Sequence, residues 1–184
     1  MNLNLNTGIT TLSATPIAWW LIGLSEAGKT TLAQALAFDL RSVNRPVYIV
    51  DGDELRRGIL KNLVFGTADR EEPYLRVAEM AKLLNQIHIF IIVALISPTS
   101  AGRNEASKII GETKMKAIYI STPRNICQQR DCKGRYAEAQ HQNDLQLTRV
   151  HSPYEILIEP DDSIDTNILA LEEAVCRLKK FHQN

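Results

Sequence analysis

The chain has 184 residues and a formal net charge of zero at pH 7. This length is enough to bury the core of one ordinary domain and is short for two. The balanced charge, with no large basic cluster, argues against a nucleic-acid surface. Three cysteines without a CxxC pair indicate neither a disulfide framework nor a zinc site.

The first fifteen residues are rich in Asn and Thr and contain neither Lys nor Arg, so they do not resemble a signal peptide. The longest apolar stretch, Ile87 to Ile96, contains His88 and is far shorter than a membrane span. We therefore expect a flexible lead over residues 1–15, one domain over residues 16–184, no membrane partner and a cytoplasmic location.

The first predicted strand, Ile17–Ile22, leads into a loop rich in small residues. This loop comprises Gly23, Leu24, Ser25, Glu26, Ala27, Gly28, Lys29, Thr30 and Thr31. A helical pattern with Leu32, Leu36 and Leu40 on one face follows it. The glycine, lysine and threonine spacing between a strand and a helix is that of a phosphate-binding loop.

The chemistry of this loop follows from its residue types. Glycines allow a sharp exit from the strand and a close approach of the backbone to a ligand. The backbone N–H groups and the helix N-terminus form a cradle for anionic oxygens. Lys29 is expected to reach the β- and γ-phosphates, and the Thr30 hydroxyl to ligate Mg²⁺. The loop therefore predicts that the chain binds ATP with Mg²⁺, with all nine loop residues lining the nucleotide.

A second polar cluster, Asp51 to Arg56, follows the predicted strand Val47–Val50. A carboxylate here could hold Mg²⁺ through water, or orient an acceptor hydroxyl for attack on the γ-phosphorus. The same residues are also compatible with ordinary turn chemistry, although a nearby phosphate loop favours the functional interpretation.

The middle of the chain predicts a loop, a helix and a strand. Asp69 is a suitable N-cap, Pro73 suits the first turn of a helix, and Arg70 could act as a bidentate anion clamp. The strand Ile89–Ile96 is almost entirely apolar, as expected of a parallel strand covered on both faces. Ser97 follows it directly.

The remainder continues the alternation of strands and helices. We expect a strand at Ala117–Ile120, a short helix at Pro123–Arg130 with Cys127 as a small core residue, and a less clear strand at Ile156–Ile158. A final helix should carry Ile168, Leu171, Val175 and Leu178 on one face. The polar stretch from residue 133 to residue 152 has the character of a loop or lid.

The alternation predicts an α/β fold of the P-loop NTPase type, with a parallel sheet sandwiched between helices in three layers, α/β/α, and one domain. Trp19 and Trp20 should lie on opposite faces of that sheet. Ligands of such sheets bind beyond the carboxyl ends of the strands, and the Gly23 loop, Asp51-Gly-Asp53 and Ser97-Pro98 each follow a predicted strand.

Taken together, these motifs resemble the adenylylsulfate (APS) kinases. The matching blocks lie in the family's order over about residues 17–182: the loop from Gly23 to Thr31, Asp51-Gly-Asp-x-x-Arg56, Phe65, Asp69-Arg70, Val77-Ala-Glu-x-Ala-Lys82, Val93-Ala-Leu-Ile-Ser-Pro98, Arg130-Asp131, Lys133-Gly134, Tyr136 and Ser152-Pro-Tyr-Glu155. The resemblance implies transfer of the γ-phosphoryl group of ATP to the ribose 3′-hydroxyl of adenylylsulfate, giving PAPS.

The resemblance also implies roles for single residues. Asp53 would be the catalytic aspartate, acting with Lys29. Arg56, Phe65 and Arg70 would contact the sulfonucleotide, and Arg130 would lie against the adenine of ATP. Ser97 matches a position sometimes described as phosphorylated. A small-molecule nucleotide substrate and a homodimer are implied as well.

The chain departs from the family's usual sequence at several positions. Glu26 stands in place of a glycine, Pro73 in place of an asparagine, and Leu75 in place of an arginine. In the lid, Leu145 replaces a lysine and Leu147 a phenylalanine. Two alternatives to an APS kinase therefore stay open at this point: a kinase for another nucleotide-linked or small hydroxyl acceptor, and an ATP-binding module without catalysis.

Overall fold

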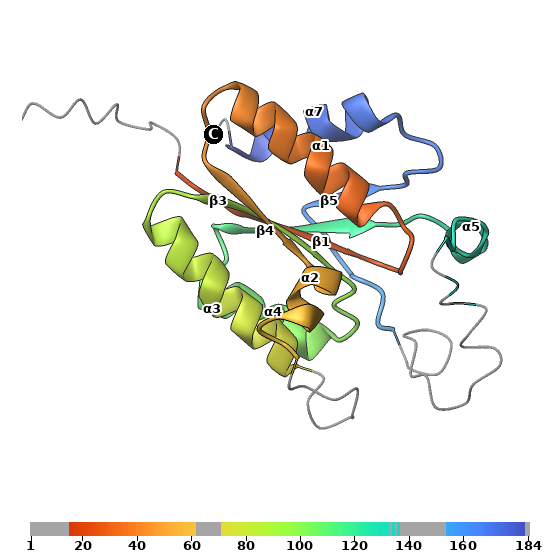
Figure 1. Cartoon of the computed structure of the whole chain (residues 1–184), viewed down its shortest axis with the longest axis horizontal. Helices are drawn as coiled ribbons and strands as arrows, with labels where there is room; N and C mark the ends of the chain where they lie inside the picture. The colour runs from red at the N-terminus through yellow and green to blue at the C-terminus, as the bar shows by residue number, and fades with distance from the viewer. Residues whose placement is uncertain (1–14, 62–70, 133, 135, 137–153, 183–184) are drawn as a thin grey trace, which may run out of the picture.

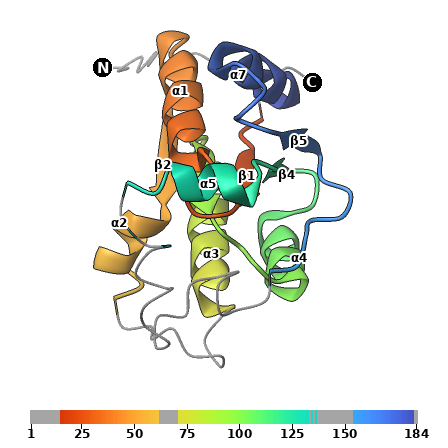
Figure 2. The same ribbon diagram turned by 90° about the vertical axis from the view of Figure 1, so that its right-hand side faces the viewer.

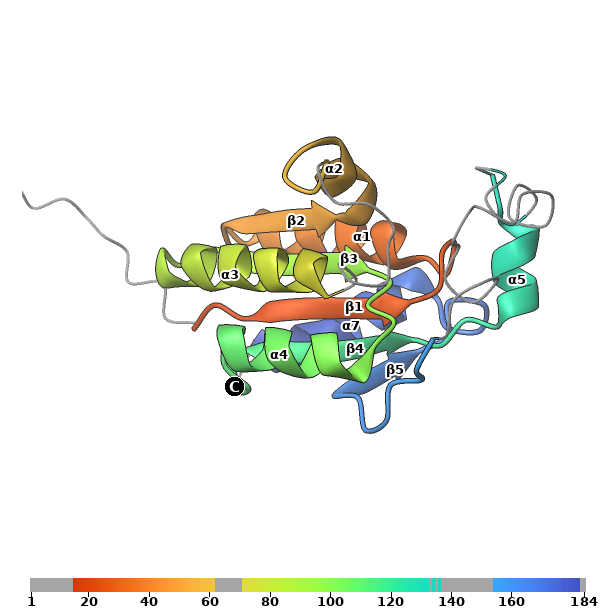
Figure 3. The same ribbon diagram turned by 90° about the horizontal axis from the view of Figure 1, so that it is seen from below.

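The computed structural model describes residues 15–61, 71–132, 134, 136 and 154–182. Within them, five strands form one sheet in the order β2-β3-β1-β4-β5, and every neighbouring pair is parallel. The strands are β1 (Ala18–Gly23), β2 (Val47–Asp51), β3 (Phe90–Leu95), β4 (Met115–Ile120) and β5 (Asp162–Ile164). Their arrows point toward the same end of the molecule, the end at which α5 lies (Figure 3).

Helices cover both faces of the sheet (Figure 1). Helices α1 (Lys29–Ser42) and α7 (Leu171–Lys179) lie on one face, and α3 (Glu72–Gln86) and α4 (Ser100–Ile110) on the other. The short α2 (Gly52–Arg57) follows β2, α5 (Arg124–Gln129) follows β4, and a 3₁₀ turn, η1 (Lys180–His182), follows α7. The predicted three-layer, single-domain α/β/α fold is thus confirmed.

The two central strands carry the core on both of their faces. Every residue of β1 and β3 is buried, which explains their unbroken apolar sequences. Trp19 packs in the cluster beneath α1 and α7, whereas Trp20 packs in the cluster beneath α3 and α4, as predicted. The Trp19 ring stacks on Phe90 with centroids 5.8 Å apart, and the His182 ring meets both of them edge-on.

The predicted strand at Ile156–Ile158 is wrong. The fifth strand is β5, and the side chains of Ile156 and Ile158 are 59% and 82% exposed. The chain turns after them through Glu159, whose φ is 55°. Apolar residues therefore marked a surface segment, and the strand itself is short and mostly polar.

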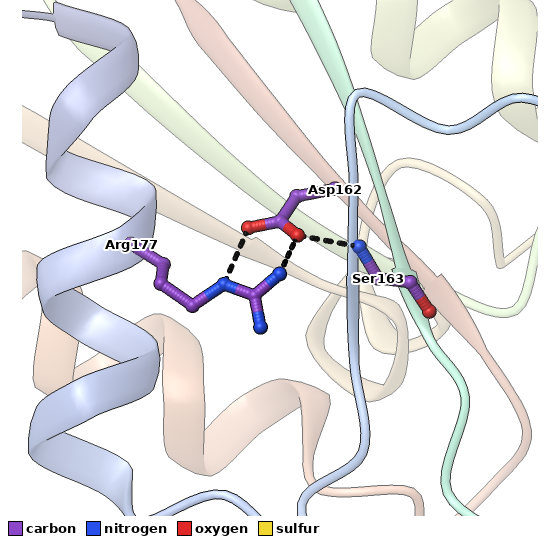
Figure 4. A network of polar contacts seen from close by, with 3 residues as sticks. All are labelled: Asp162, Ser163 and Arg177. Carbon is purple, nitrogen blue, oxygen red and sulfur yellow. Dashed lines mark hydrogen bonds and ion pairs between the residues drawn. The ribbon is translucent and has the colours of Figure 1, made fainter.

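Strand β5 is held to helix α7 by an ion pair (Figure 4). Arg177 donates from Nε to Asp162 Oδ2 over 3.0 Å, and its Nη2 donates to Asp162 Oδ1. Asp162 Oδ1 also accepts the backbone N–H of Ser163 at 2.7 Å. Helix α7 begins at Leu171, so the expected helical position of Ile168 is also wrong, and that side chain is 81% exposed.

The carboxyl ends of the strands gather the segments that the sequence marked as functional. The loop after β1, the turn into α2 after β2 and the segment after β3 all leave the sheet on this side, together with α5 (Figure 2). Helix α3 has proline in its first turn, as predicted. Asp69, its expected N-cap, lies outside the described residues.

Candidate active site

Two glycines set the path of the loop after β1. Gly28 caps helix α1 with φ 98° and ψ 8°, a left-handed conformation that glycine adopts without strain. Gly23 is also constrained, because a Cβ atom there would lie 2.7 Å from the carbonyl oxygen of Ile120. The two glycines therefore allow the strand to pass closely by β4 and then to turn into the helix.

Lys29, the first residue of α1, lies over this loop. Its Nζ donates to the carbonyl oxygens of Gly23 and Leu24, at 3.0 and 2.5 Å. The residue is only 8% exposed, so its positive charge is held inside the loop and not at the outer surface. This is the position from which an ammonium group can contact phosphate oxygens that enter the cradle.

Thr30 and Asp51 bring the start of α1 to the end of β2. The Thr30 hydroxyl donates to Asp51 Oδ2 at 2.7 Å, and Asp51 Oδ1 accepts the N–H of Asp53 at 2.9 Å, capping α2. A hydroxyl and a carboxylate in contact are the hard oxygen ligands that suit Mg²⁺, which takes one or two protein ligands besides phosphate and water. In the described part of the chain, no three His, Cys, Asp or Glu side chains group around a metal position.

Asp51 opens the polar cluster in which the sequence indicated a carboxylate for Mg²⁺, but no role was assigned to it individually. The signal was present, since a carboxylate directly after a strand can hold Mg²⁺ through water. Its hydrogen bond to Thr30 is what the sequence could not show. Asp53 and Arg56 lie on the same short helix, in its first and last turns. Phe65 and Arg70 lie outside the described residues, so their roles stay predictions.

Arg130 lies at the end of α5 and contacts the chain beyond β5. Its Nη1 donates to Thr166 Oγ1 at 2.7 Å, and its Nη2 to the Thr166 carbonyl oxygen at 3.2 Å. Thr166 and Thr122 in turn both contact the phosphate loop at the Ala27 carbonyl. Sequence reasoning missed both threonines, because they are far from the loop in the chain and belong to no motif that we identified.

Comparison with known proteins assigns this arrangement to a family. A family model described as Adenylylsulphate kinase matches residues 15–165. The chain belongs to the adenylylsulfate kinase family.

Individual relatives agree with this assignment. The adenylyl-sulfate kinase of Bacteroides fragilis is 41% identical over 159 residues, which cover 86% of this chain and 79% of the relative. The structure of the Mycobacterium tuberculosis APS kinase in complex with AMPPNP and APS matches with a TM-score of 0.87 and 28% identity, over 92% of this chain and 99% of that one. A hexameric APS kinase from Thiobacillus denitrificans matches with a TM-score of 0.68 and 27% identity, over 92% of this chain and 29% of that one.

Glu26 places a carboxylate in the phosphate loop. Its φ is 58°, so a residue with a Cβ atom and a negative charge occupies a left-handed position that favours glycine. The side chain is half-buried, and its Oε2 lies 4.0 Å from the Sγ of Cys132. The loop thus carries both backbone strain and a carboxylate close to where anionic oxygens would bind.

The buried Tyr136 is hydrogen-bonded to the backbone of the phosphate loop. Its hydroxyl donates to the Ser25 carbonyl oxygen at 3.1 Å, and its N–H donates to Asp131 Oδ2 at 2.7 Å. Burial raises the pKa of the Tyr136 phenol to about 12, so the hydroxyl keeps its proton for this hydrogen bond. Cys127 is fully buried in the core, as predicted, and this burial raises the pKa of its thiol.

Ser97 follows β3 as expected, yet its side chain lies in the core. The residue is fully buried with φ 45°, and its Oγ accepts the indole N–H of Trp20 at 2.8 Å. Arg103 Nη1 donates to the Ser97 carbonyl oxygen at 2.9 Å. The hydroxyl therefore has a structural partner here, and a catalytic or modified Ser97 stays a prediction.

Helix α4 and the chain that follows residue 153 are joined by polar contacts. Glu155 Oε2 accepts the N–H of Ser100 at 2.6 Å. Hydrogen bonding with the Ser100 side chain, and then with its backbone N–H, lowers the pKa of the Glu155 carboxyl. Arg103, only 5% exposed, donates from Nη1 to the Glu155 carbonyl oxygen at 3.0 Å.

The lid positions Leu145 and Leu147 lie outside the described residues. No helix in the described ranges is both long and apolar enough to cross a membrane.

Proposed function

We propose that this protein is an ATP-dependent adenylylsulfate kinase, which transfers the γ-phosphoryl group of ATP to the 3′-hydroxyl of adenylylsulfate to give PAPS and ADP. The observation that carries the proposal is the likeness, over nearly the whole chain, to an APS kinase solved with AMPPNP and APS. The phosphate loop and the Asp51–Asp53 turn lie at the same edge of the sheet, where such a reaction needs them.

On the donor side, Lys29 contacts the β- and γ-phosphate oxygens, and the loop N–H groups hold the remaining charge. Thr30 and Asp51 would hold Mg²⁺, and the ion would supply positive charge beside the phosphate oxygens. Arg130 lies against the base. These contacts fix the γ-phosphorus in line with the acceptor.

On the acceptor side, Asp53 orients the 3′-hydroxyl and takes its proton. As the new bond from the 3′-oxygen to the γ-phosphorus forms, the bond from that phosphorus to the β,γ-bridging oxygen breaks, and ADP leaves with the electron pair. Arg56 and Arg70 bind the anionic groups of adenylylsulfate, and Phe65 packs against the nucleotide.

We also propose a cytoplasmic location and a homodimer. All three cysteines are free thiols, in keeping with a reducing compartment. The hexameric relative shows that assembly occurs within the family. Size-exclusion chromatography with light scattering measures the mass in solution, and a monomer would refute the homodimer.

The test of the activity is ADP release from MgATP by the purified chain, with and without micromolar adenylylsulfate, with the product identified by mass. We expect ADP and PAPS in equal amounts, and no turnover from Lys29→Ala. ATP binding without turnover of adenylylsulfate would refute the proposal. A panel of other nucleotide-linked hydroxyl acceptors would then separate a kinase of different specificity from a module without catalysis.

A further inference from the structure

Two threonine hydroxyls converge on one carbonyl oxygen of the phosphate loop, that of Ala27. Thr122 Oγ1 lies 3.0 Å from this oxygen, and Thr166 Oγ1 lies 2.9 Å from it. Thr122 stands between β4 and α5, and Thr166 between β5 and α7. Segments far apart in the sequence therefore fix the same peptide group.

The fixed donors of this cluster limit where the hydroxyl hydrogens can point. A guanidinium group only donates, so Thr166 Oγ1 accepts from Arg130 Nη1 and must direct its own proton elsewhere. The backbone N–H of Thr166 donates to Thr122 Oγ1 at 3.2 Å, so the Thr122 proton is also directed away from it. Both protons can then point to Ala27, whose carbonyl oxygen has two lone pairs. The two hydroxyl oxygens also lie 2.9 Å apart, so either hydroxyl can instead donate to the other.

Arg130 thus sits at the start of a directed chain, from guanidinium to hydroxyl to carbonyl. Because a charged donor polarises the hydroxyl that accepts from it, the hydrogen bond that this hydroxyl donates is strengthened. Removing either Arg130 or the Thr166 hydroxyl interrupts the same chain. Their effects on the loop should therefore not add.

The peptide that these bonds fix is the one that places Gly28. In a trans peptide the carbonyl and the N–H point in opposite directions, so holding the Ala27 oxygen toward the threonines directs the Gly28 N–H away from them. The space beside Gly28 is also filled by Thr166, since a Cβ atom on Gly28 would lie 3.0 Å from both Cγ2 and Oγ1 of that residue. Thr166 therefore limits both the orientation and the position of the loop where it enters α1.

We propose that Thr166 is a positioning residue through which Arg130 acts on the phosphate loop, so that Arg130 supports phosphate binding and not only contact with the base. The inference rests on the proposed function for its assignment of the loop to ATP phosphates. It predicts that replacing Arg130 weakens the binding of a ligand that has phosphates but no base.

Binding of MgATP and of Mg-tripolyphosphate, each measured by calorimetry, tests this prediction. The proteins are the unmodified chain, Thr166→Val, Thr166→Ser, Arg130→Ala and the double variant Arg130→Ala/Thr166→Val. Ser42→Ala is the matched control, because it removes a hydroxyl that donates to the Asp39 carbonyl oxygen at 2.6 Å, at the far end of α1. Thermal unfolding of each variant establishes that it is folded at the temperature of the titration.

We expect Thr166→Val and Arg130→Ala each to weaken tripolyphosphate binding by about ten-fold, the scale of a lost charge-assisted hydrogen bond. The double variant should be little weaker than either single one, and Thr166→Ser and Ser42→Ala should bind like the unmodified chain. Independent effects that multiply to about a hundred-fold in the double variant would overturn the inference.

Two other results would also overturn it. One is Arg130→Ala weakening MgATP but not tripolyphosphate, because Arg130 would then act on the base alone. The other is Thr166→Val binding both ligands normally. Failure of the proposed function looks different: tight MgATP binding with the expected pattern among the variants, but no turnover of adenylylsulfate. An unmodified chain that binds neither ligand would overturn both.

Discussion

The strained carboxylate in the phosphate loop has two effects that separate variants can distinguish. Glu26→Gln removes the charge and keeps a side chain at φ 58°, whereas Glu26→Gly removes both the charge and the strain. A non-glycine residue in the left-handed region costs of the order of 1–3 kcal/mol, and the extra freedom of glycine in the unfolded chain offsets about 0.5–1 kcal/mol of the relief.

We therefore expect Glu26→Gly to raise the free energy of unfolding by about 1 kcal/mol, or Tm by about 2–4 °C for a chain of this size. Glu26→Gln should leave both nearly unchanged. For ATP, one unit charge at about 6 Å from another, in an effective dielectric constant of about 40–80, costs about 1 kcal/mol. Both variants should therefore lower the Kd of MgATP by about five-fold.

Urea denaturation, thermal unfolding and calorimetric titration with MgATP measure these changes. The backbone argument is wrong if Glu26→Gln stabilises the chain as much as Glu26→Gly does. The electrostatic argument is wrong if the Kd of MgATP is unchanged in both variants, since the carboxylate must then be screened from the phosphates. A higher salt concentration should narrow the difference in Kd between the unmodified chain and the Glu26→Gln variant, as expected for a charge effect.

Three further predictions concern the scaffold. Ser97→Ala leaves the buried indole N–H of Trp20 without its acceptor, so urea denaturation should show a fall of about 1–3 kcal/mol in the free energy of unfolding. An unchanged kcat in this variant would argue against a catalytic Ser97. Burial lowers the pKa of His182 below 6.5, so the unfolded chain binds a proton at this imidazole more readily than the folded chain does. The free energy of unfolding should be at its full value above about pH 6.5 and should fall as the pH drops through the lowered pKa. A His182→Leu variant that keeps the whole of this pH dependence would show that His182 is not its source. Asp162→Asn weakens the partly exposed ion pair with Arg177 that joins β5 to α7. Urea denaturation should show a fall of about 1 kcal/mol in the free energy of unfolding. An unchanged free energy of unfolding would show that the pair is energetically neutral.

Much of the fold follows from the sequence where burial is complete. Strands β1 and β3 are apolar throughout because helices cover both of their faces, and this pattern made them predictable. Among the described strands, β5 lies at the edge of the sheet and pairs with β4 alone, so three residues, two of them polar, suffice. The apolar Ile156–Ile158 was a better strand by composition, yet it lies at the surface.

The candidate site divides in a similar way. The phosphate loop and the turn into α2 are continuous in sequence, so their spacing predicted them. The contacts of Thr166 with Thr122 and Ala27 span 44 and 139 residues, and depend on how β4 and β5 end beside β1. Ser97 was placed correctly after β3, but the direction of its side chain depends on its left-handed φ, which residue type did not indicate.

The two tryptophans are adjacent in sequence and lie on opposite sides of the sheet. Their fluorescence therefore reports separately on the two layers of the core. Trp19 stacks on Phe90 near the C-terminal turn, and Trp20 donates to Ser97 at the carboxyl end of β3. Both indoles are fully buried, so each should emit at short wavelength in the folded state and shift to longer wavelength on exposure to water. Trp19→Phe and Trp20→Phe variants would leave one reporter each, and would show whether the two layers of the core unfold together or one after the other.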